Sequence, residues 1–421
     1  MPYRSNRGII IKSMIKLGSI FVLLVLIIIL LPANMGCNGD KSFNARLNEI
    51  VNPYRFSLIG WEFQTLSDEL NDFLFGTYRG DAEDISLVNE YFSIKRSLYE
   101  ITIEKGPLAS YATIEVIITA LQKRLEKLEP KVDKIIERQI RNTLSELGIH
   151  NPVYDCIGLS VGFPPVNFIL EPPPYLLVVS PRDRIESIRE IMLKPDITLE
   201  EIAEIEAAVD QLGVSSIIVK LGGVSTYPSF VSNGTSFNLR STIEIAVEEW
   251  LHQYLFFKPL GFSYALHISG IHRDYQITVL NEAAVGIISE EIVTSLFNRY
   301  YGHLEIDAIP ENGDREESVF HQEMREIRRN VDRLLSKGMV IEAEQFMEQK
   351  RTYLSSLGYY IRKLNQAYFA FKGMYADEPT SIDPIGEELR ILRNQCYSVS
   401  QFLSIVANMN SRQDLTERVE D

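Results

Sequence analysis

The segment 241–258, STIEIAVEEWLHQYLFFK, constrains the fold more than any other stretch of the 421-residue chain. As a helix it carries apolar side chains on nearly every side, and a helix of this kind is buried in a large domain. Glu248, Glu249 and His252 nevertheless lie in its middle. Burial of ionisable groups costs on the order of several kcal/mol unless they are paired or bind a metal. The fold must therefore compensate these three side chains.

The spacing of the three ionisable residues limits how they are compensated. Glu248 and His252 are four residues apart, so they project from one face of the helix on successive turns. Glu249 lies three residues before His252, on the neighbouring face. A divalent metal ion is one solution for such a group. A buried ion network without catalysis, with Arg240, Lys258 or His272 as partner, is the other.

Net charge argues against one class of partner. The chain carries a net charge of −15, and its first 37 residues hold four basic residues and no acid. The remainder therefore carries −19 (−15 minus 4). An acidic body repels phosphate backbones, so we expect no nucleic-acid partner.

Residues 1–37 have the pattern of a signal or membrane anchor. Basic residues precede the apolar run 17–31, LGSIFVLLVLIIILL, which Pro32 ends. This run is shorter than the roughly 20 residues of a usual span. The basic side should stay cytoplasmic, which predicts a single-pass protein of the cell membrane with its body outside the cytoplasm and the lipid bilayer as a partner. Lipidation at Cys37, after cleavage as a lipoprotein, is the alternative.

The rest of the chain predicts an α+β, predominantly helical fold in three regions. Residues 38–155 form an N-terminal helical region, in which Pro130 is expected to kink or restart a long helix. Residues 156–305 form an α+β core with short strands before the central helix. Its proline-flanked strands within 161–185 suit sheet edges. Residues 306–421 form a C-terminal helical region.

The signals around the central helix predict its neighbours. Ser241 and Glu244 have the spacing of a capping box at its start. Pro259 and Gly261 end it, and 261–278 is expected to be a loop or short hairpin. A second apolar helix with internal acids is predicted over 279–298. Further along, the aromatic-rich stretch 358–377 is expected to be a helix that forms core, lines a substrate groove or binds a peptide terminus.

Two short motifs together resemble a known family. Glu248-Glu249-Trp250-Leu251-His252 is similar to HExxH, with glutamate in place of the first histidine. Asn281-Glu282-Ala283-Ala284 is similar to the Asn-Glu-x-x-Ala segment of a following helix, although Val285 stands at the alanine position. Over residues 215–300 the chain therefore resembles the core of the gluzincin metallopeptidases, which implies a zincin-like fold.

The resemblance implies a function and assigns roles. Glu248, His252 and Glu282 would bind zinc, and Glu249 would activate the attacking water in peptide-bond hydrolysis. The strand near Gly223–Tyr227 would align a peptide or protein substrate. Replacing a histidine ligand by a carboxylate lowers the charge on the metal, so another divalent ion, or no metal, remains open.

Several neighbours have supporting roles that the sequence leaves open. His267 and His272 are candidate donors to an oxyanion, and Glu290 is a candidate acceptor for His252. Four tyrosines are similarly placed: Tyr264, Tyr275, Tyr300 and Tyr301. The alternative function is a non-catalytic, helical interaction protein whose peptidase-like centre has lost its metal. The substrate, endo- or exopeptidase action and oligomeric state are not specified by the sequence.

Overall fold

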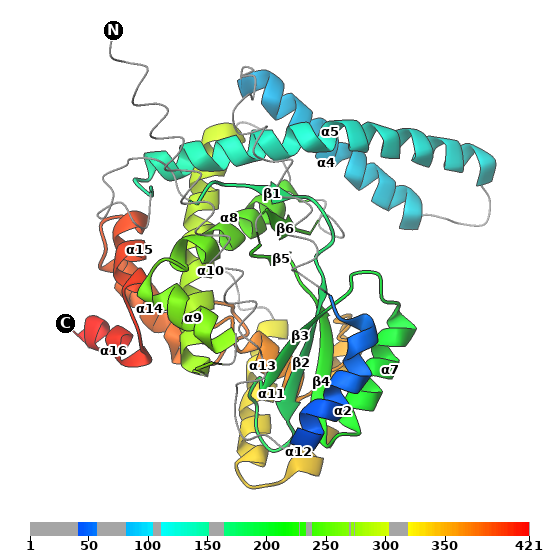
Figure 1. The fold of residues 1–421 in the computed structure, drawn as a ribbon, viewed down its shortest axis with the longest axis vertical. Coiled ribbons are helices and arrows are strands. Elements are labelled where there is room, and N and C mark those ends of the chain that lie inside the picture. The colour runs from blue at the N-terminus through cyan, green and yellow to red at the C-terminus, as the bar shows by residue number, and fades with distance from the viewer. Residues whose placement is uncertain are drawn as a thin grey trace.

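The protein is predominantly helical and contains two small three-stranded sheets (Figure 1). The coarse expectation of a mainly helical α+β fold is therefore confirmed. The structure is a computed structural model that describes residues 41–56, 81–103, 111–150, 164–226, 228–232, 238–268, 271–272, 274–302 and 319–420.

Three consecutive helices form the centre of the molecule: α8 (Leu239–Leu255), α9 (Pro259–Ile268) and α10 (Tyr275–Tyr300). The predicted helices 241–258 and 279–298 correspond to α8 and α10. Asp274 caps α10, accepting hydrogen bonds from the backbone N–H groups of Gln276 and Ile277. Apolar side chains on most sides of α8 and α10 lie in the largest core, as an all-round apolar helix requires.

The start of α8 differs from the prediction. Its N-cap is Asn238, whose side chain accepts a hydrogen bond from the Arg240 backbone N–H at 2.9 Å. The predicted capping box of Ser241 and Glu244 is wrong because the helix begins two residues earlier. Glu244 therefore lies within the helix, one turn before Glu248.

Residues 259–268 form a helix, so the loop or hairpin predicted there is wrong. Proline fits the first turn of a helix, where its missing N–H has no intrahelical partner. Pro259 therefore starts α9 as well as ending its predecessor. A Cβ at Gly261 would collide with the backbone carbonyl of Leu255, so glycine permits the tight turn between α8 and α9.

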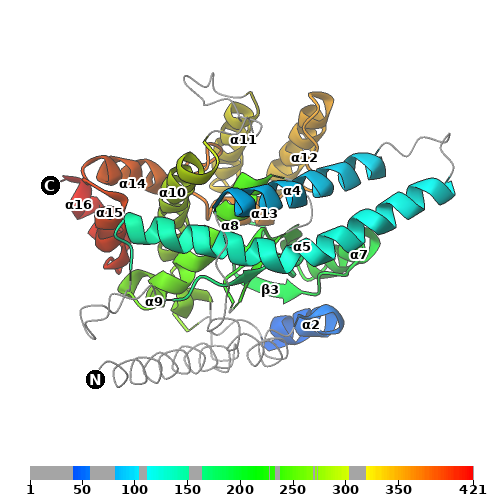
Figure 2. The same ribbon diagram turned by 90° about the horizontal axis from the view of Figure 1, so that it is seen from above.

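An N-terminal helical pair, α4 (Asp81–Ile103) and α5 (Tyr111–Glu146), packs side by side (Figure 2). Ile136 and Ile140 of α5 reach the core shared with α8 and α10. Pro130 lies inside α5 without ending it, so α5 does not restart there.

The larger sheet has the order β3 (Arg189–Leu193), β2 (Tyr175–Pro181), β4 (Val214–Lys220), and both pairings are antiparallel. The helix α2 (Lys41–Val51), followed by the 3-10 turn η1 (Asn52–Tyr54), and α7 (Leu199–Asp210) cover one face, and α13 (Gln366–Lys372) covers the other (Figure 1). The edge position expected for the proline-flanked segment is wrong for β2, which is central. Three prolines precede β2 and Pro181 is its last residue, so they leave the hydrogen-bond ladder intact.

The smaller sheet has the order β1 (Phe168–Ile169), β6 (Ser229–Val231), β5 (Gly223–Val224). β1 and β6 are parallel, whereas β6 and β5 are antiparallel. In the described part of the chain β5 is therefore an edge strand. It contacts α8, as does β6.

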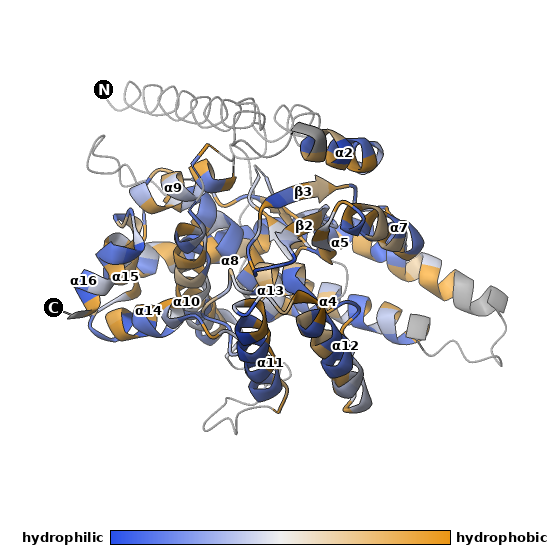
Figure 3. Cartoon of the chain, turned by 90° about the horizontal axis from the view of Figure 1, so that it is seen from below, coloured by the Kyte–Doolittle hydropathy of each residue, from blue (hydrophilic) through white to orange (hydrophobic). Residues whose placement is uncertain are grey.

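The C-terminal region adds helices on two sides of the molecule. α11 (Val319–Leu335) and α12 (Val340–Ser356) form a hairpin, with Gly338 in the left-handed conformation between them. Figure 3 shows α11 as largely hydrophilic, and its buried apolar residues form one stripe: Met324, Ile327, Val331 and Leu335. Three more helices pack against α10: α14 (Pro384–Asn394), α15 (Val399–Ala407) and α16 (Arg412–Glu420).

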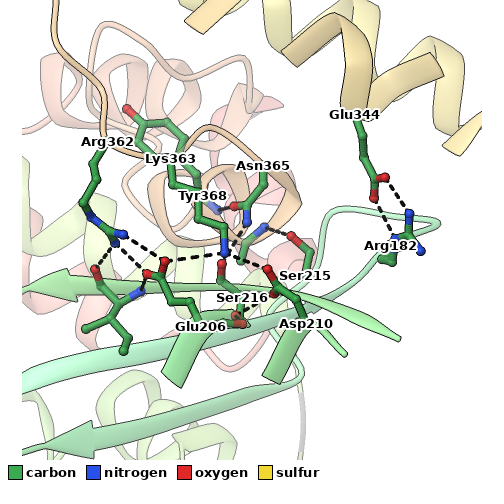
Figure 4. Close-up of polar contacts among 12 residues, drawn as sticks. Arg182, Glu206, Asp210, Ser215, Ser216, Glu344, Arg362, Lys363, Asn365 and Tyr368 are labelled. Carbon is green, nitrogen blue, oxygen red and sulfur yellow. Dashed lines mark hydrogen bonds and ion pairs between the residues drawn. The ribbon is translucent and has the colours of Figure 1, made fainter. Parts of the chain in front are cut away.

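A polar network fastens the segment before α13 to the larger sheet (Figure 4). Both terminal nitrogens of Arg362 donate to the Glu206 carboxylate, at 2.8 and 2.6 Å. Glu206 also accepts the backbone N–H of Ile218 at 2.6 Å. Asn365 donates to the carbonyl of Ser216 at 2.8 Å. Only Gln366–Lys372 of the helix predicted over 358–377 is helical, because Asn365 caps it and the preceding residues bind the sheet.

The membrane predictions need correction. No helix within the described ranges is both long and apolar enough to cross a bilayer. The apolar run 17–31 and Cys37, on which the transmembrane helix, signal anchor and cell-membrane location were predicted, lie outside those ranges. We therefore withdraw the single-pass topology. The predicted region boundaries at 155/156 and 305/306 also fall outside the described residues and stay predictions.

Candidate active site

Buried acids from three parts of the chain meet between α8 and α10. We call this group the acidic centre: Glu248, Glu249 and His252 on α8, Glu282 on α10, and Tyr375 and Asp377 from the segment between α13 and α14. Electrostatic interactions couple the carboxylates of Glu248, Glu249 and Glu282 to one another. The sequence predicted that α8 and α10 would bring these three acids together.

His252 and Glu282 face each other across the two helices. The His252 Nε2 atom lies 3.7 Å from Glu282 Oε2, and the two side chains are only 13% and 11% exposed. Tyr264 on α9 donates its hydroxyl to Glu282 Oε1 at 2.5 Å. Its ring also stacks on His252, with 5.5 Å between ring centroids and 18° between planes. Tyr264 therefore orients both groups and leaves Oε2 of Glu282 directed at the imidazole.

Glu248 lies one turn before His252 and is held by α10. Ser289 donates its hydroxyl to Glu248 Oε1 at 3.3 Å. Burial raises the pKa of the Glu248 carboxyl to about 8, and the negative charges of Glu244, Glu282 and Asp377 contribute to the rise. Without a compensating cation, this carboxyl holds a proton at neutral pH.

Glu249 is directed at the smaller sheet. Burial raises its pKa well above the ordinary value, and the charges of Glu248 and Glu282 raise it further. A Cβ added at Gly223 of β5 would lie 2.5 Å from Glu249 Oε1 and 2.7 Å from Ile245. Glycine at this position therefore gives the carboxyl its space. No described residue donates a hydrogen bond to that carboxyl.

The predicted substrate strand is present only in part. Gly223 lies in the edge strand β5, directly beside Glu249. Ser225, just after the strand, donates its hydroxyl to the backbone carbonyl of Glu249 at 2.9 Å. Tyr227 lies outside the described residues.

Two residues of the centre were not predicted from sequence. Burial, followed by the charges of Glu282, Glu248 and Glu249, raises the pKa of Tyr375 well above its usual value. Burial raises the pKa of the Asp377 carboxyl to about 7.

The Asp377 carboxyl contacts α10 at Gly286, where a side chain would collide with it. Its Oδ1 atom is buried, with no hydrogen-bond partner in the described part of the chain. The only sequence signal for this contact is a glycine inside an apolar helix, which often marks close packing.

The other candidates are not brought to the centre. His272 is exposed, and its backbone N–H donates to the Leu266 carbonyl at 3.2 Å. Glu290 is exposed, and its charge acts on Glu244. His267 accepts the backbone N–H of Asp274 at its Nδ1 atom, at 2.8 Å.

The donor set fits a divalent cation in its chemistry and in part of its geometry. Two ligands about 2.1 Å from a tetrahedral metal lie about 3.4 Å apart, close to the His252–Glu282 separation of 3.7 Å. The third predicted ligand, Glu248, is bonded to Ser289 instead. Accordingly, no group of three His, Cys, Asp or Glu side chains in the described ranges has the arrangement of a metal site.

One feature nevertheless favours a cation. Among the described residues, all the charges that act on Glu248 and Glu249 are negative. His252 Nδ1, on the other side of the ring from Nε2, is buried without a described hydrogen-bond partner, so the second hydrogen bond typical of a metal-bound histidine is missing. Carboxylate oxygens and imidazole nitrogen suit zinc, and carboxylates also suit manganese. A cation here would offset the mutual repulsion of the acids.

The arrangement places the Glu249 carboxyl beside β5, an edge strand within the described residues, and groups it with His252 and further acids. Such a site can accept a proton from a small nucleophile near a bound chain. Comparison of the sequence with protein-family models, with curated proteins and with solved structures found no match.

Proposed function

We propose that the protein is a metal-dependent hydrolase that cleaves peptide bonds at the acidic centre. His252, Glu282 and Glu248 would hold a divalent cation, zinc or manganese. The observation that carries the proposal is the opposition of His252 Nε2 and Glu282 Oε2 at 3.7 Å, beside the buried Glu249 carboxyl. The zincin-like arrangement of the core belongs to the same proposal.

A bound cation would supply Lewis-acid polarisation of the substrate carbonyl. It would also lower the raised pKa values of the acids around it, because an opposite charge favours their ionised forms. Ionised Glu249 then accepts a proton from the attacking water. It is the candidate for this general base because its carboxyl takes no hydrogen bond from the described residues and lies next to β5.

The edge strand β5 provides a way to orient a peptide. An extended peptide can add to an exposed sheet edge through main-chain hydrogen bonds, which bind it without regard to its side chains. Gly223 leaves no side chain between such a peptide and the Glu249 carboxyl. A peptide bound along β5 would therefore present its backbone to the general base.

Two tyrosines complete the assignment of roles. Tyr264 positions Glu282 through its 2.5 Å hydrogen bond and contacts the His252 ring. The Tyr375 hydroxyl lies among the three carboxylates, and it replaces His272 as the candidate donor to the substrate oxygen that gains negative charge.

The test combines metal analysis with peptide hydrolysis. Purified protein loaded with zinc or manganese is assayed against a mixture of unmodified peptides, with cleavage read by mass spectrometry. Glu249→Gln should bind metal normally and lose at least 100-fold in rate, whereas Glu282→Ala should lose both metal and activity. Glu200→Gln, at an exposed position, is the matched control. Wild-type protein that binds no stoichiometric metal and cleaves no peptide would refute the proposal.

The second candidate function is a non-catalytic interaction protein, and one observation favours it. The described residues contain no ready-made group of three metal ligands. Buried acids with raised pKa values can also persist without a metal by holding protons. Metal-free protein whose stability does not change when zinc or manganese is added would support this candidate.

A further inference from the structure

A pocket of about 230 Å³ lies between α10, α11, α13 and the residues before α14. Its lining includes Tyr275, Arg328, Tyr368, Lys372 and Ser381. Apolar side chains of α11 and α13 form the remaining wall, together with Ile382 and Pro384. This pocket has no part in the functional assignment above.

Two cations face the pocket in a chain with a net charge of −15, and each of them is paired with an acid outside the lining. Arg328 and Lys372 contribute two cations, and Asp383 is the only acid in the lining. The carboxylate of Asp383 caps α14 by accepting the Ile385 N–H at 3.0 Å. Its negative charge is therefore partly engaged at the start of that helix, where the helix dipole favours an acid.

Hydrogen-bond donors in the pocket remain available to a ligand. Arg328 uses Nε for Asp332 at 2.9 Å and Nη1 for the Phe369 carbonyl at 3.3 Å. Its Nη2 group has no hydrogen-bond partner in the described part of the chain, and neither does the Tyr368 hydroxyl. Lys372 is paired with Glu378 at 2.9 Å, outside the pocket lining.

The position of the pocket relates it to the acidic centre. Tyr275 and Glu282 are seven residues apart on α10, which places them on the same helix face about 10.5 Å apart. Lys372 Nζ also lies 5.9 Å from the ring centroid of Tyr375. An extended peptide rises about 3.3 Å per residue, so three residues span this separation.

We propose that this pocket binds a carboxylate of the peptide substrate, located about three residues from the bond that is cleaved. The Nη2 group of Arg328 offers two N–H donors to a carboxylate, and Lys372, which is paired with Glu378, lines the same pocket. The carboxylate is the free C-terminus of a short peptide or an acidic side chain. This inference rests on the proposed function, because the acidic centre supplies the cleavage site.

Binding is tested separately from hydrolysis by isothermal titration calorimetry on the zinc-loaded Glu249→Gln variant. The probes are a hexapeptide without acidic side chains, ending in a free carboxylate, and its C-terminal amide. A second amidated pair carries either glutamate or glutamine at its third-last position. At least one acid-bearing peptide should bind at least tenfold more tightly than its neutral partner, and the pair that discriminates identifies the source of the carboxylate.

Variants of the pocket assign that preference to its residues. In the same background, Arg328→Gln and Lys372→Gln should each reduce the preference at least fivefold without weakening the neutral peptides. Arg329→Gln, at the neighbouring exposed position, is the control and should change neither. Two variants are used because Arg328 also contacts α13, and their melting temperatures report on folding.

The outcomes separate the pocket from the proposed function. Equal affinity for acid-bearing and neutral peptides, absence of binding to all four, or equal weakening of both kinds by the variants would overturn the carboxylate pocket. If wild-type protein cleaves all four peptides equally and the affinities are equal, the hydrolase proposal stands and only the carboxylate pocket is overturned. Selective binding without any cleavage by wild-type protein overturns the hydrolase alone.

Discussion

Replacement of Glu248 by glutamine should change how the stability of the metal-free protein depends on pH. In the folded protein the pKa of Glu248 is about 8, compared with an ordinary value of 4.5. The folded state therefore holds a proton that the unfolded chain releases between these two pH values. The stabilising contribution of this group is fully present below pH 4.5 and is lost as the pH rises through 8.

The size of the effect follows from the two pKa values. Their difference is about 3.5 (8 minus 4.5), and each pKa unit corresponds to about 1.36 kcal/mol. The full loss is therefore about 5 kcal/mol, of which about 3.5 kcal/mol falls between pH 5 and pH 8. Glutamine keeps the shape of the neutral carboxyl and does not titrate. Between pH 5 and pH 8 the unfolding free energy of Glu248→Gln should therefore rise by about 3.5 kcal/mol relative to that of the wild type.

Urea unfolding in the presence of a chelator, at pH 5, 6, 7 and 8, measures the difference directly. Glu200→Gln is the control, and its stability should follow the wild type at every pH. A difference between Glu248→Gln and wild type that is the same at pH 5 and pH 8 would refute the reasoning. It would mean that Glu248 is ionised in the folded protein and is compensated by a group not identified here.

Three further predictions test other parts of the structure. Gly223→Ala should lower the unfolding free energy by about 1–3 kcal/mol because its methyl group overlaps the Glu249 carboxyl. Gly222→Ala, where a methyl group has more space, is the comparison, and equal urea midpoints for the two variants would contradict this prediction. Tyr264→Phe should weaken zinc binding at least tenfold in calorimetry, since the Tyr264 hydroxyl orients Glu282, a proposed zinc ligand, through a hydrogen bond. Unchanged zinc affinity would exclude this positioning role of Tyr264. Arg362→Ala should cost about 1–3 kcal/mol, because it removes the bidentate partner of the buried Glu206 carboxylate and leaves only Lys363, at 3.5 Å, as a cation beside it. Loss of the more exposed pair of Arg351 should cost less than about 1 kcal/mol.

The two central helices could be predicted because their signals are local. Apolar residues at helical spacing identified both, and the motif residues fixed which turns carry His252 and Glu282. The structure places the side chains of these two residues 3.7 Å apart. The start of the first helix was misplaced because Ser241 and Glu244 have capping spacing, while Asn238 provides the actual cap.

Other parts could not be predicted because their determinants lie far apart in the chain. Tyr375 and Asp377 reach the acidic centre from more than ninety residues beyond Glu282, and no local pattern indicates that contact. Two predictions that rested on proline were wrong. Pro259 starts a helix as well as ending one, and Pro181 closes a strand that is central in its sheet.

The stretch 358–377 shows how tertiary contacts replace a local preference. Its aromatic residues predicted one long helix. In the structure, Arg362 and Lys363 pair with acids of α7, and Asn365 bonds the sheet before capping the short helix α13. The Arg362 guanidinium pairs with the buried carboxylate of Glu206, and residues 359–365 are irregular rather than helical where this pairing is made.

The contribution of residues 375–377 has a consequence for the timing of biosynthesis. Domains form as the polypeptide leaves the ribosome, beginning at the N-terminus. The helices that carry His252 and Glu282 are made well before Tyr375 and Asp377 join them. A nascent chain therefore lacks a complete centre until residue 377 has been translated, 95 residues (377 minus 282) after Glu282.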